Sequence, residues 1–150
     1  MNMNYLQIRQ AKVEDARSIS LLSQQLGYSI SEEAIKIYLK SLATAKEWIV
    51  YIACKSESIL GWINIYLTHG ILADKQAEVG GLIVDKNFRS QGIGRLLMQK
   101  GQTWAQQQGC NLIQVRSRTT RQQAHDFYQN IGYEPYKIQL VLRKQLNLTE

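Results

Sequence analysis

Two glycines and three basic side chains lie within one short stretch, where a predicted strand gives way to a predicted helix. Gly92 and Gly94 open the helix, and Lys86, Arg89 and Arg95 flank them. The first backbone N–H groups of a helix have no partner within it and lie at the positive end of its dipole. Without β-carbons here, a diphosphate can approach these N–H groups closely. The stretch therefore predicts a site for a phosphorylated ligand.

Two common phosphate-binding patterns do not fit this stretch. A P-loop ends in Gly-Lys-Ser/Thr, whereas this chain continues Gly94-Arg95-Leu96. A dinucleotide fingerprint has a third glycine where Leu97 stands, and it follows the first strand of a βαβ unit rather than a fourth strand. A diphosphate held mainly by backbone amides, without a metal, remains, and coenzyme A fits that description.

The same stretch carries a family resemblance. Residues 89–94, RSQGIG, resemble the R/Q-x-x-G-x-G/A signature of the GNAT superfamily of N-acetyltransferases. Residues 8–16, IRQAKVEDA, look like the family's first strand and helix, and residues 124–133, AHDFYQNIGY, look like its late helix-to-strand motif. The resemblance covers nearly the whole chain, and it implies a single N-acetyltransferase (GNAT) domain over residues 1–150.

The resemblance implies an acetyl-CoA site without a metal ion. In the family, the pantetheine arm pairs with the fourth strand like an added strand, and the amides at the helix start hold the pyrophosphate. Carried over, the cofactor-binding residues are Leu82, Ile83 and Val84 on the strand, and Arg89, Ser90, Gln91, Gly92, Ile93, Gly94 and Arg95 in the turn. The pair Gly80-Gly81 agrees independently, because glycine inside a strand marks a bulge or the close approach of another backbone.

Acetyl transfer to an amine requires a neutral nucleophile, a donor to the developing negative oxygen, and a hydrogen bond for the leaving thiolate. An amine like that of lysine, with a pKa of about 10.4, is almost fully protonated at neutral pH, so a general base is needed. Glu78 is the candidate base, because some family members place a glutamate at the start of this strand; an ordered water is the alternative. A backbone N–H near Leu82 is the donor that the family suggests.

Tyr128 is the candidate donor of the hydrogen bond to the leaving thiolate. In the helix after Arg121, an apolar face is formed by Ala124, Phe127 and Ile131, and Tyr128 lies at its edge. The family places its general acid at this position. A proton transfer from a tyrosine with pKa near 10 to a thiolate with pKa near 8.5 is uphill by about 2 kcal/mol, which favours a hydrogen bond over full transfer. Many family members carry asparagine where Arg121 stands, so Arg121 is expected to bind the cofactor phosphates instead.

Hydrophobic periodicity and turn residues predict an α/β fold whose mixed, mostly antiparallel central sheet is flanked by helices. The expected order is β-α-α-β-β-β-α-β-α-β. The expected elements are strands at 5–9, 48–54, 58–67, 77–84, 112–116 and 136–143, and helices at 14–27, 29–42, 91–108 and 121–131. Ser29 and Glu32 have the spacing of a capping box for the second helix.

Composition limits the class of protein. The 150 residues are 45% hydrophobic and 20% charged, which is typical of one globular domain. The net charge of +6 comes from scattered residues, so it favours an anionic cofactor rather than a nucleic acid. Neither the two cysteines nor the two histidines have metal-site spacing. The longest apolar run is too short for a bilayer and no signal peptide begins the chain, so a cytoplasmic protein without a membrane segment is expected.

These observations predict an acetyl-CoA-dependent N-acetyltransferase in which an amine of a small molecule or peptide attacks the thioester directly in a ternary complex. The alternative is a non-catalytic acyl-CoA-binding or regulatory module. By family analogy the acceptor would lie among Tyr28, Tyr38, Trp62 and Tyr133. Edge strands near the C-terminus allow a homodimer.

Overall fold

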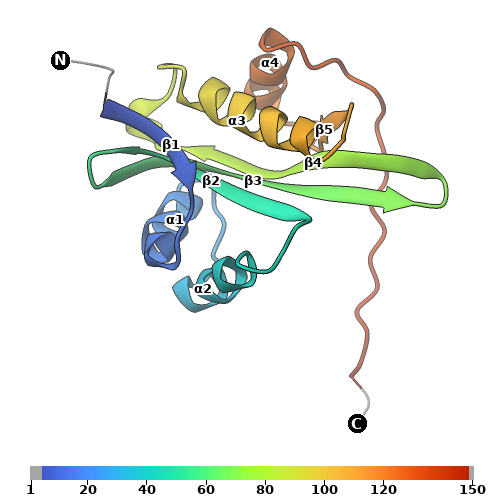
Figure 1. The fold of residues 1–150 in the computed structure, drawn as a ribbon. Coiled ribbons are helices and arrows are strands. Elements are labelled where there is room, and N and C mark those ends of the chain that lie inside the picture. Colours follow the sequence, from blue (N-terminus) through green and yellow to red (C-terminus); the bar gives the residue numbers. More distant parts are fainter. Residues whose placement is uncertain (1–4, 149–150) are drawn as a thin grey trace. The chain divides into compact units, whose positions relative to one another are not determined.

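The computed structural model describes residues 5–148, and the chain divides into two compact units, Met1–Arg116 and Ser117–Glu150 (Figure 1). The first unit contains the sheet and three helices. Its elements in chain order are β1 (Leu6–Gln10), the 3-10 turn η2 (Val13–Asp15), α1 (Ala16–Gln24), α2 (Glu32–Ser41), β2 (Trp48–Lys55), β3 (Ser58–Gly70), β4 (Ala73–Val84), the 3-10 turn η3 (Lys86–Phe88), α3 (Ile93–Gln107) and β5 (Ile113–Val115).

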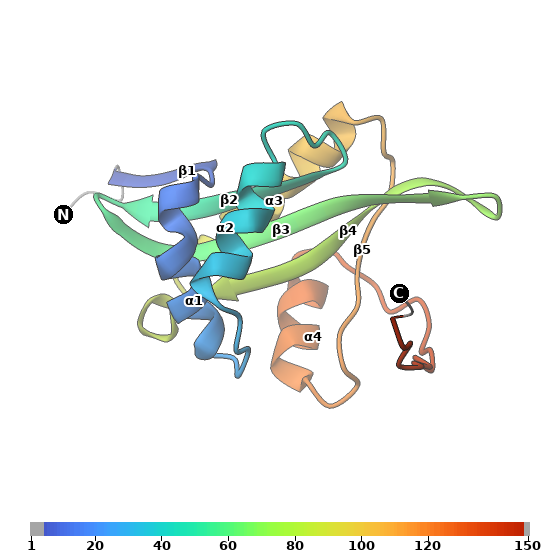
Figure 2. The same cartoon turned by 90° about the horizontal axis from the view of Figure 1, so that it is seen from below.

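The strands form one five-stranded sheet in the order β1-β2-β3-β4-β5. Neighbouring strands are antiparallel except β4 and β5, which are parallel and joined through α3. Helices α1 and α2 cover one face of this sheet and α3 covers the other (Figures 1 and 2). The predicted α/β fold with a mixed, mostly antiparallel sheet is confirmed.

Apolar side chains on both faces of the sheet form the core. Under α1 and α2, Ile19, Leu39 and Ile52 are buried. On the other face α3 approaches the sheet closely at Gly101, where an added β-carbon would collide with the side chain of Ile65. Leu96, on the same helix, is 38% exposed.

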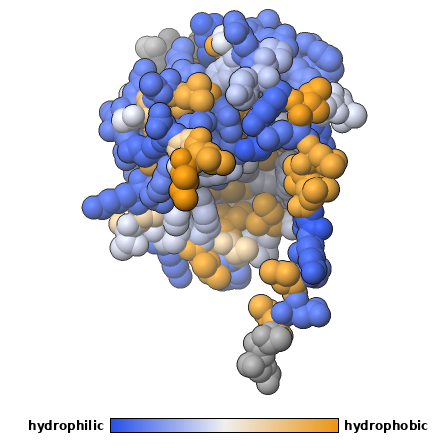
Figure 3. Space-filling view, turned by 90° about the vertical axis from the view of Figure 1, so that its right-hand side faces the viewer, coloured by the Kyte–Doolittle hydropathy of each residue, from blue (hydrophilic) through white to orange (hydrophobic). Residues whose placement is uncertain are grey.

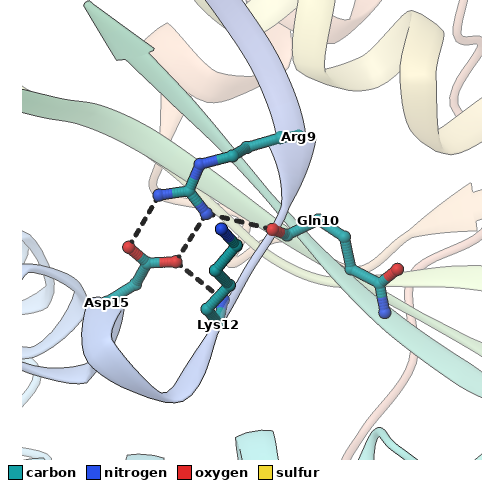
Figure 4. A network of polar contacts seen from close by, with 4 residues as sticks. All are labelled: Arg9, Gln10, Lys12 and Asp15. Atoms are coloured by element: carbon teal, nitrogen blue, oxygen red, sulfur yellow. Dashed lines mark hydrogen bonds and ion pairs between the residues drawn. The ribbon is translucent and has the colours of Figure 1, made fainter. Parts of the chain in front are cut away.

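A bidentate ion pair joins β1 to the start of α1 (Figure 4). The Arg9 guanidinium donates to both oxygens of Asp15, at 2.8 and 2.9 Å, and the Lys12 backbone N–H donates to the same carboxylate at 2.7 Å. Burial acts to raise the pKa of Asp15, but the hydrogen bonds from Arg9 and Lys12 outweigh it, so this pKa lies below its ordinary value. The carboxylate thus links the first strand to the first helix.

Replacing Asp15 with asparagine is expected to lower the free energy of unfolding by about 2 kcal/mol, because hydrogen bonds to a charged partner are lost. Since the folded-state pKa is depressed, this stabilisation is present above about pH 4 and is lost as the pH falls through the folded pKa. Urea unfolding at pH 7 and pH 3 measures both effects. Glu14→Gln, at an exposed neighbouring carboxylate, is the control; equal losses in both variants would contradict the role of the pair.

Helix α2 begins later than the predicted capping box. Its N-cap is Ser31, whose side chain accepts a hydrogen bond from the Ala34 N–H at 3.1 Å. Glu32 lies in the first turn, where the helix dipole favours a negative charge. The predicted box from Ser29 was therefore wrong by two residues; Ile35, Leu39 and Leu42 are buried.

The second unit consists of α4 (Gln122–Asn130) and the chain that follows it. Helix α4 ends in a Schellman motif, in which the Tyr133 N–H donates to the Tyr128 carbonyl and the Gly132 N–H donates to the Gln129 carbonyl. Gly132 supplies the left-handed backbone that this motif needs, with φ of +100°. The final strand predicted over residues 136–143 is not formed, because no described strand pairs with this segment.

Candidate active site

A β-bulge interrupts strand β4 at the predicted glycine pair. Asn64 on β3 faces Gly81 and Ile65 faces Val79, so Gly80 is the extra residue. An added β-carbon at Gly80 would lie 2.6 Å from the side-chain oxygen of Asn64, and one at Gly81 would lie 2.8 Å from the ring of Trp62. Of the two features that the glycine pair predicted, the bulge is present. Side chains of the neighbouring strand occupy the space beside both glycines.

Beyond the bulge, strand β4 loses its neighbour on one side. The parallel pairing with β5 covers only Ala77, Glu78 and Val79. Among the described strands none pairs with residues 80–84 on that side, so an extended ligand has backbone groups to pair with. Of the predicted pantetheine contacts, Leu82 and Val84 are half-buried, whereas the Ile83 side chain is in the core at 3% exposure. Ile83 can therefore meet a ligand only through its backbone.

The turn after β4 is held by its own polar groups. The Asp85 carboxylate accepts a hydrogen bond from the Asn87 N–H at 2.9 Å, and the Asp85 carbonyl accepts one from the Phe88 N–H at 2.9 Å. The Arg89 side chain donates from Nε to the Val84 carbonyl at 3.1 Å. Arg89 thus fixes the path of the chain between the strand and the helix.

Helix α3 presents a row of backbone donors at its start. Gly92 is its N-cap, with φ of +85°, and Ser90 is also left-handed, with φ of +62°. The Leu96 N–H donates to the Gly92 carbonyl at 3.1 Å, but within the described chain the N–H groups of residues 90–95 have no hydrogen-bond acceptor. A β-carbon at Gly92 would meet nothing within 4 Å. The space beside Gly92 is therefore clear of protein atoms, as the close approach of a diphosphate requires.

Glu78 is buried at 4% exposure, and polar side chains surround its carboxylate. The Tyr66 hydroxyl and Arg116 Nε both donate to Oε2 at 2.9 Å. Gln114 Nε2 donates to Oε1 at 2.7 Å. Sequence reasoning missed these three partners, because they come from β3 and from β5 and its end and reach Glu78 only through strand register.

This arrangement limits what the Glu78 carboxylate can do. A carboxylate has about four acceptor positions, and at least three are used here. Burial, and then the nearby Glu78 carboxylate, raise the pKa of the Tyr66 hydroxyl, so Tyr66 remains a neutral donor. Glu78 is thus held in one orientation by side chains from two neighbouring strands.

Two of the aromatic residues predicted near an acceptor lie in the first unit, close to the bulge. The Tyr38 hydroxyl accepts a hydrogen bond from Asn64 Nδ2 at 3.0 Å, and its ring stacks on Trp48 with ring centres 6.0 Å apart. The Trp62 ring covers Gly81. Tyr28, by contrast, is 50% exposed.

The second unit holds the remaining predicted site residues, Arg121 and Tyr128. The Tyr128 ring contacts Phe127 and Tyr133 edge-on, with ring centres 5.0 and 5.7 Å away. Burial raises the pKa of the Tyr128 hydroxyl to about 12, against the opposing charge of Arg121. Arg121 is the exposed N-cap of α4, and its charge acts on Tyr128.

Within residues 5–148, no group of three or more His, Cys, Asp or Glu side chains is arranged to hold a metal ion. No helix within the same range combines the length and the apolar character needed to cross a membrane.

Comparison with known proteins agrees with this geometry. A model of the acetyltransferase (GNAT) family matches residues 14–133. An aminoglycoside N(6')-acetyltransferase type 1 from Stenotrophomonas maltophilia is 27% identical over 132 residues, which are 85% of each chain. The structure of AAC(6')-Iy in complex with a bisubstrate analogue has a TM-score of 0.82 and 19% identity, covering 94% of this chain and 99% of that one. An aminoglycoside 6'-N-acetyltransferase from Acinetobacter baumannii has a TM-score of 0.79 and 17% identity, covering 95% and 99%.

The bulged β4, the crossover through α3 and the open donors between them are therefore parts of an acyltransferase fold. Because the family model spans most of its length, the chain belongs to the acetyltransferase (GNAT) family. The protein is an enzyme of the N-acetyltransferase class, and the acetyl donor of this family is acetyl-CoA.

Proposed function

We propose that the protein transfers the acetyl group of acetyl-CoA to an amino group of an aminoglycoside, by direct attack of the amine on the thioester in a ternary complex. The observation that carries the proposal is the open row of N–H donors at residues 90–95, beside a strand edge without a neighbour. The choice of acceptor is supported by the relative from Stenotrophomonas maltophilia, which is named as an aminoglycoside acetyltransferase.

The residues present fit coenzyme A. The donors of Ser90, Gln91, Gly92, Ile93, Gly94 and Arg95 hold the diphosphate, with charge added by the exposed side chain of Arg95. The backbone of residues 82–84 pairs with the pantetheine arm. When bound, the thioester supplies an activated carbonyl carbon and a thiol leaving group. A backbone N–H near Leu82 donates to the carbonyl oxygen as negative charge develops on it.

Glu78 is the proposed general base. Its carboxylate takes the proton of the attacking amine, while Tyr66, Gln114 and Arg116 hold the carboxylate in place. The proton therefore moves from the amine nitrogen to the carboxylate as the new C–N bond forms. Arg116 offsets the negative charge that a polar but buried carboxylate carries.

Tyr128 is proposed to donate a hydrogen bond to the sulfur as the C–S bond breaks. This role rests on the place of Tyr128 in the family's late motif. With a tyrosine pKa of about 12, full transfer to a thiolate of pKa near 8.5 would be uphill by about 5 kcal/mol. Because of this difference in pKa, we propose a neutral hydroxyl that stabilises the thiolate by a hydrogen bond and keeps its proton. Arg121 is proposed to contact the cofactor phosphates.

Release of free CoA thiol in the presence of aminoglycosides tests the function. We expect thiol release with 2-deoxystreptamine aminoglycosides and a singly acetylated product by mass spectrometry. Polyamines, amino acids and a lysine peptide serve as comparison acceptors. Turnover of those amines alone would refute the acceptor class. Cofactor binding without thiol release from any amine would favour a non-catalytic acyl-CoA-binding module.

Acetyl-CoA is expected to raise the melting temperature, because a ligand that binds only the folded state at 100 times its Kd stabilises it by about 2.7 kcal/mol. Pantetheine, which lacks the diphosphate, is the matched control and should give a much smaller shift at equal concentration. Differential scanning fluorimetry measures both. Equal shifts with the two compounds would mean that the donors at residues 90–95 do not hold the diphosphate.

A further inference from the structure

Surface hydropathy alone does not mark the groups that an acceptor would contact. Figure 3 shows hydrophilic and hydrophobic residues interspersed over the side of the molecule that it presents. Hydrogen-bonding groups are more selective, because a hydroxyl with a proton left to donate favours only a ligand that offers an acceptor atom. Tyr38 carries such a hydroxyl, on helix α2, which lies on the same face of the sheet as the polar network around Asn64.

The side chain of Asn64 is held in one orientation by two acceptors. Its Nδ2 donates to the Ile49 carbonyl on β2 at 3.1 Å and to the Tyr38 hydroxyl oxygen at 3.0 Å. Because a backbone carbonyl can only accept, the amide nitrogen rather than the amide oxygen must face Ile49. Both hydrogens of that nitrogen are then used. The Tyr38 oxygen therefore accepts in this pair, and its own proton must point elsewhere.

The hydroxyl proton of Tyr38 has no acceptor among the side chains and backbone of residues 5–148. The residue is 38% exposed, and its ring is fixed by stacking on Trp48. Partial burial raises the pKa of the Tyr38 hydroxyl above its ordinary value, and the hydrogen bond from Asn64 only partly opposes this. Tyr38 is thus a neutral donor, fixed in place, whose proton a ligand can use.

The same network reaches the proposed general base, Glu78. A β-carbon added at Gly80 would lie 2.6 Å from Asn64 Oδ1 and 3.0 Å from Tyr66 Cε1, so these two side chains meet over the bulge. Tyr66 in turn donates to Glu78. Burial is the largest cause of the raised pKa of Tyr66, Glu78 is the next, and Tyr38 adds to it, so the two hydroxyls lie within electrostatic range. The Tyr38 proton is therefore near the place where an amine would approach Glu78.

We propose that the Tyr38 hydroxyl donates a hydrogen bond to an oxygen atom of the acceptor, close to the amino group that reacts, and that Asn64 is the positioning residue that directs the hydroxyl proton. The lone pair of the amine is used in the attack on the thioester, so Tyr38 requires a second acceptor atom. Tyr38 thereby determines specificity: amines with an ether or hydroxyl oxygen near the nitrogen react better than alkylamines of the same shape. The inference rests on the proposed function, since it takes Glu78 as the group that the amine approaches.

Two small amines that differ in one ring atom test the proposal. Aminomethyl-tetrahydropyran, substituted next to its ring oxygen, has a methylene group in place of that oxygen in aminomethylcyclohexane. We expect Tyr38→Phe to lower kcat/KM about 3- to 10-fold for the first amine, as for one hydrogen bond between neutral groups, and less than about twofold for the second. Thiol release at saturating acetyl-CoA measures both. Dividing the wild-type value by the variant value for each amine removes the difference in pKa between the amines.

Asn64→Asp tests the positioning role. The introduced carboxylate accepts the Tyr38 proton and turns it away from the acceptor, so this variant should lose the same preference for the oxygen-containing amine. The double variant Tyr38→Phe/Asn64→Asp should lose no more preference than Tyr38→Phe, because both changes remove one hydrogen bond. Tyr51→Phe, at a tyrosine whose ring centre lies 5.4 Å from the Lys100 ammonium of α3, is the matched control and should keep the wild-type preference.

Several results would overturn the proposal. They are equal losses with both amines in Tyr38→Phe, no loss with either, and a wild type that acetylates an aminoglycoside but not the oxygen-containing amine. An unchanged preference in Asn64→Asp would remove the positioning role of Asn64. Failure of the wild type to acetylate any amine, aminoglycosides included, would refute the proposed function instead. Acetyl-CoA melting shifts on the same samples verify that each variant is folded.

Discussion

Replacing Tyr128 with phenylalanine is expected to lower kcat about 10- to 100-fold while the KM for acetyl-CoA changes less than about twofold. A hydrogen bond to a charged partner contributes about 1.5–3 kcal/mol, and each 1.36 kcal/mol is tenfold in rate. The bond to sulfur forms as the thiolate develops, so its loss affects the transition state more than the bound cofactor. Steady-state kinetics with acetyl-CoA varied at saturating amine measures both constants.

The pH profile adds a second check on Tyr128. Because burial raises its pKa from about 10 to about 12, the hydroxyl stays protonated, and the tyrosine should cause no fall in kcat up to about pH 11. An alkaline limb near pH 10 that disappears in the phenylalanine variant would contradict this. Tyr51→Phe, at a tyrosine buried in β2, is the matched control and should keep wild-type kcat. An unchanged kcat in the Tyr128 variant would remove its assigned role.

Replacing Glu78 with glutamine is expected to lower kcat about 100-fold or more at pH 7, because a positioned general base contributes about 10²–10⁴-fold. The defect should shrink as the pH rises toward the pKa of the acceptor amine, since the amine then loses its proton without help. The ratio of wild-type to variant kcat across pH 6.5–9.5 measures this. Asp74→Asn, at an exposed carboxylate of the same strand, is the control.

The same pH profile distinguishes a general base from a residue that only binds the acceptor amine. If ordered water removes the proton and Glu78 only holds the acceptor, the glutamine variant will raise the KM for the amine by a factor that does not change with pH. Because Glu78 is buried among three hydrogen-bond donors, its variant must also be examined by thermal melting. Tyr66→Phe removes one of these donors and should reproduce part of the kcat loss if the orientation of Glu78 matters.

Local patterns predicted the parts of this fold that depend on near neighbours in sequence. The glycine turn, the β2–β3 hairpin and the crossover helix follow from glycine positions, alternation and helical periodicity. The bulge at Gly80 was also predicted, because a glycine weakens the interior of a strand and is typical of a bulge or of a close backbone approach. The start of α2 was misplaced, because two serines compete as caps and side-chain geometry decides between them.

The surroundings of Glu78 could not be predicted in the same way. Tyr66 and Gln114 are 12 and 36 positions away in sequence and reach it only through the register of three strands. The final strand predicted over residues 136–143 was wrong as an element of the described sheet. A period of two in the sequence indicates a strand, but it contains no information on which strand would pair with it.

The glycine pair in β4 also constrains how this protein can be re-engineered. Trp62 and Asn64 occupy the space that side chains at Gly81 and Gly80 would take, so a side chain at either glycine requires its neighbour on β3 to move. A variant library that randomises β4 alone, to admit bulkier acyl chains, would therefore meet these two side chains in every member. Productive variants would have to alter both strands together, for example by shrinking the indole at 62 in the same clone that enlarges position 81.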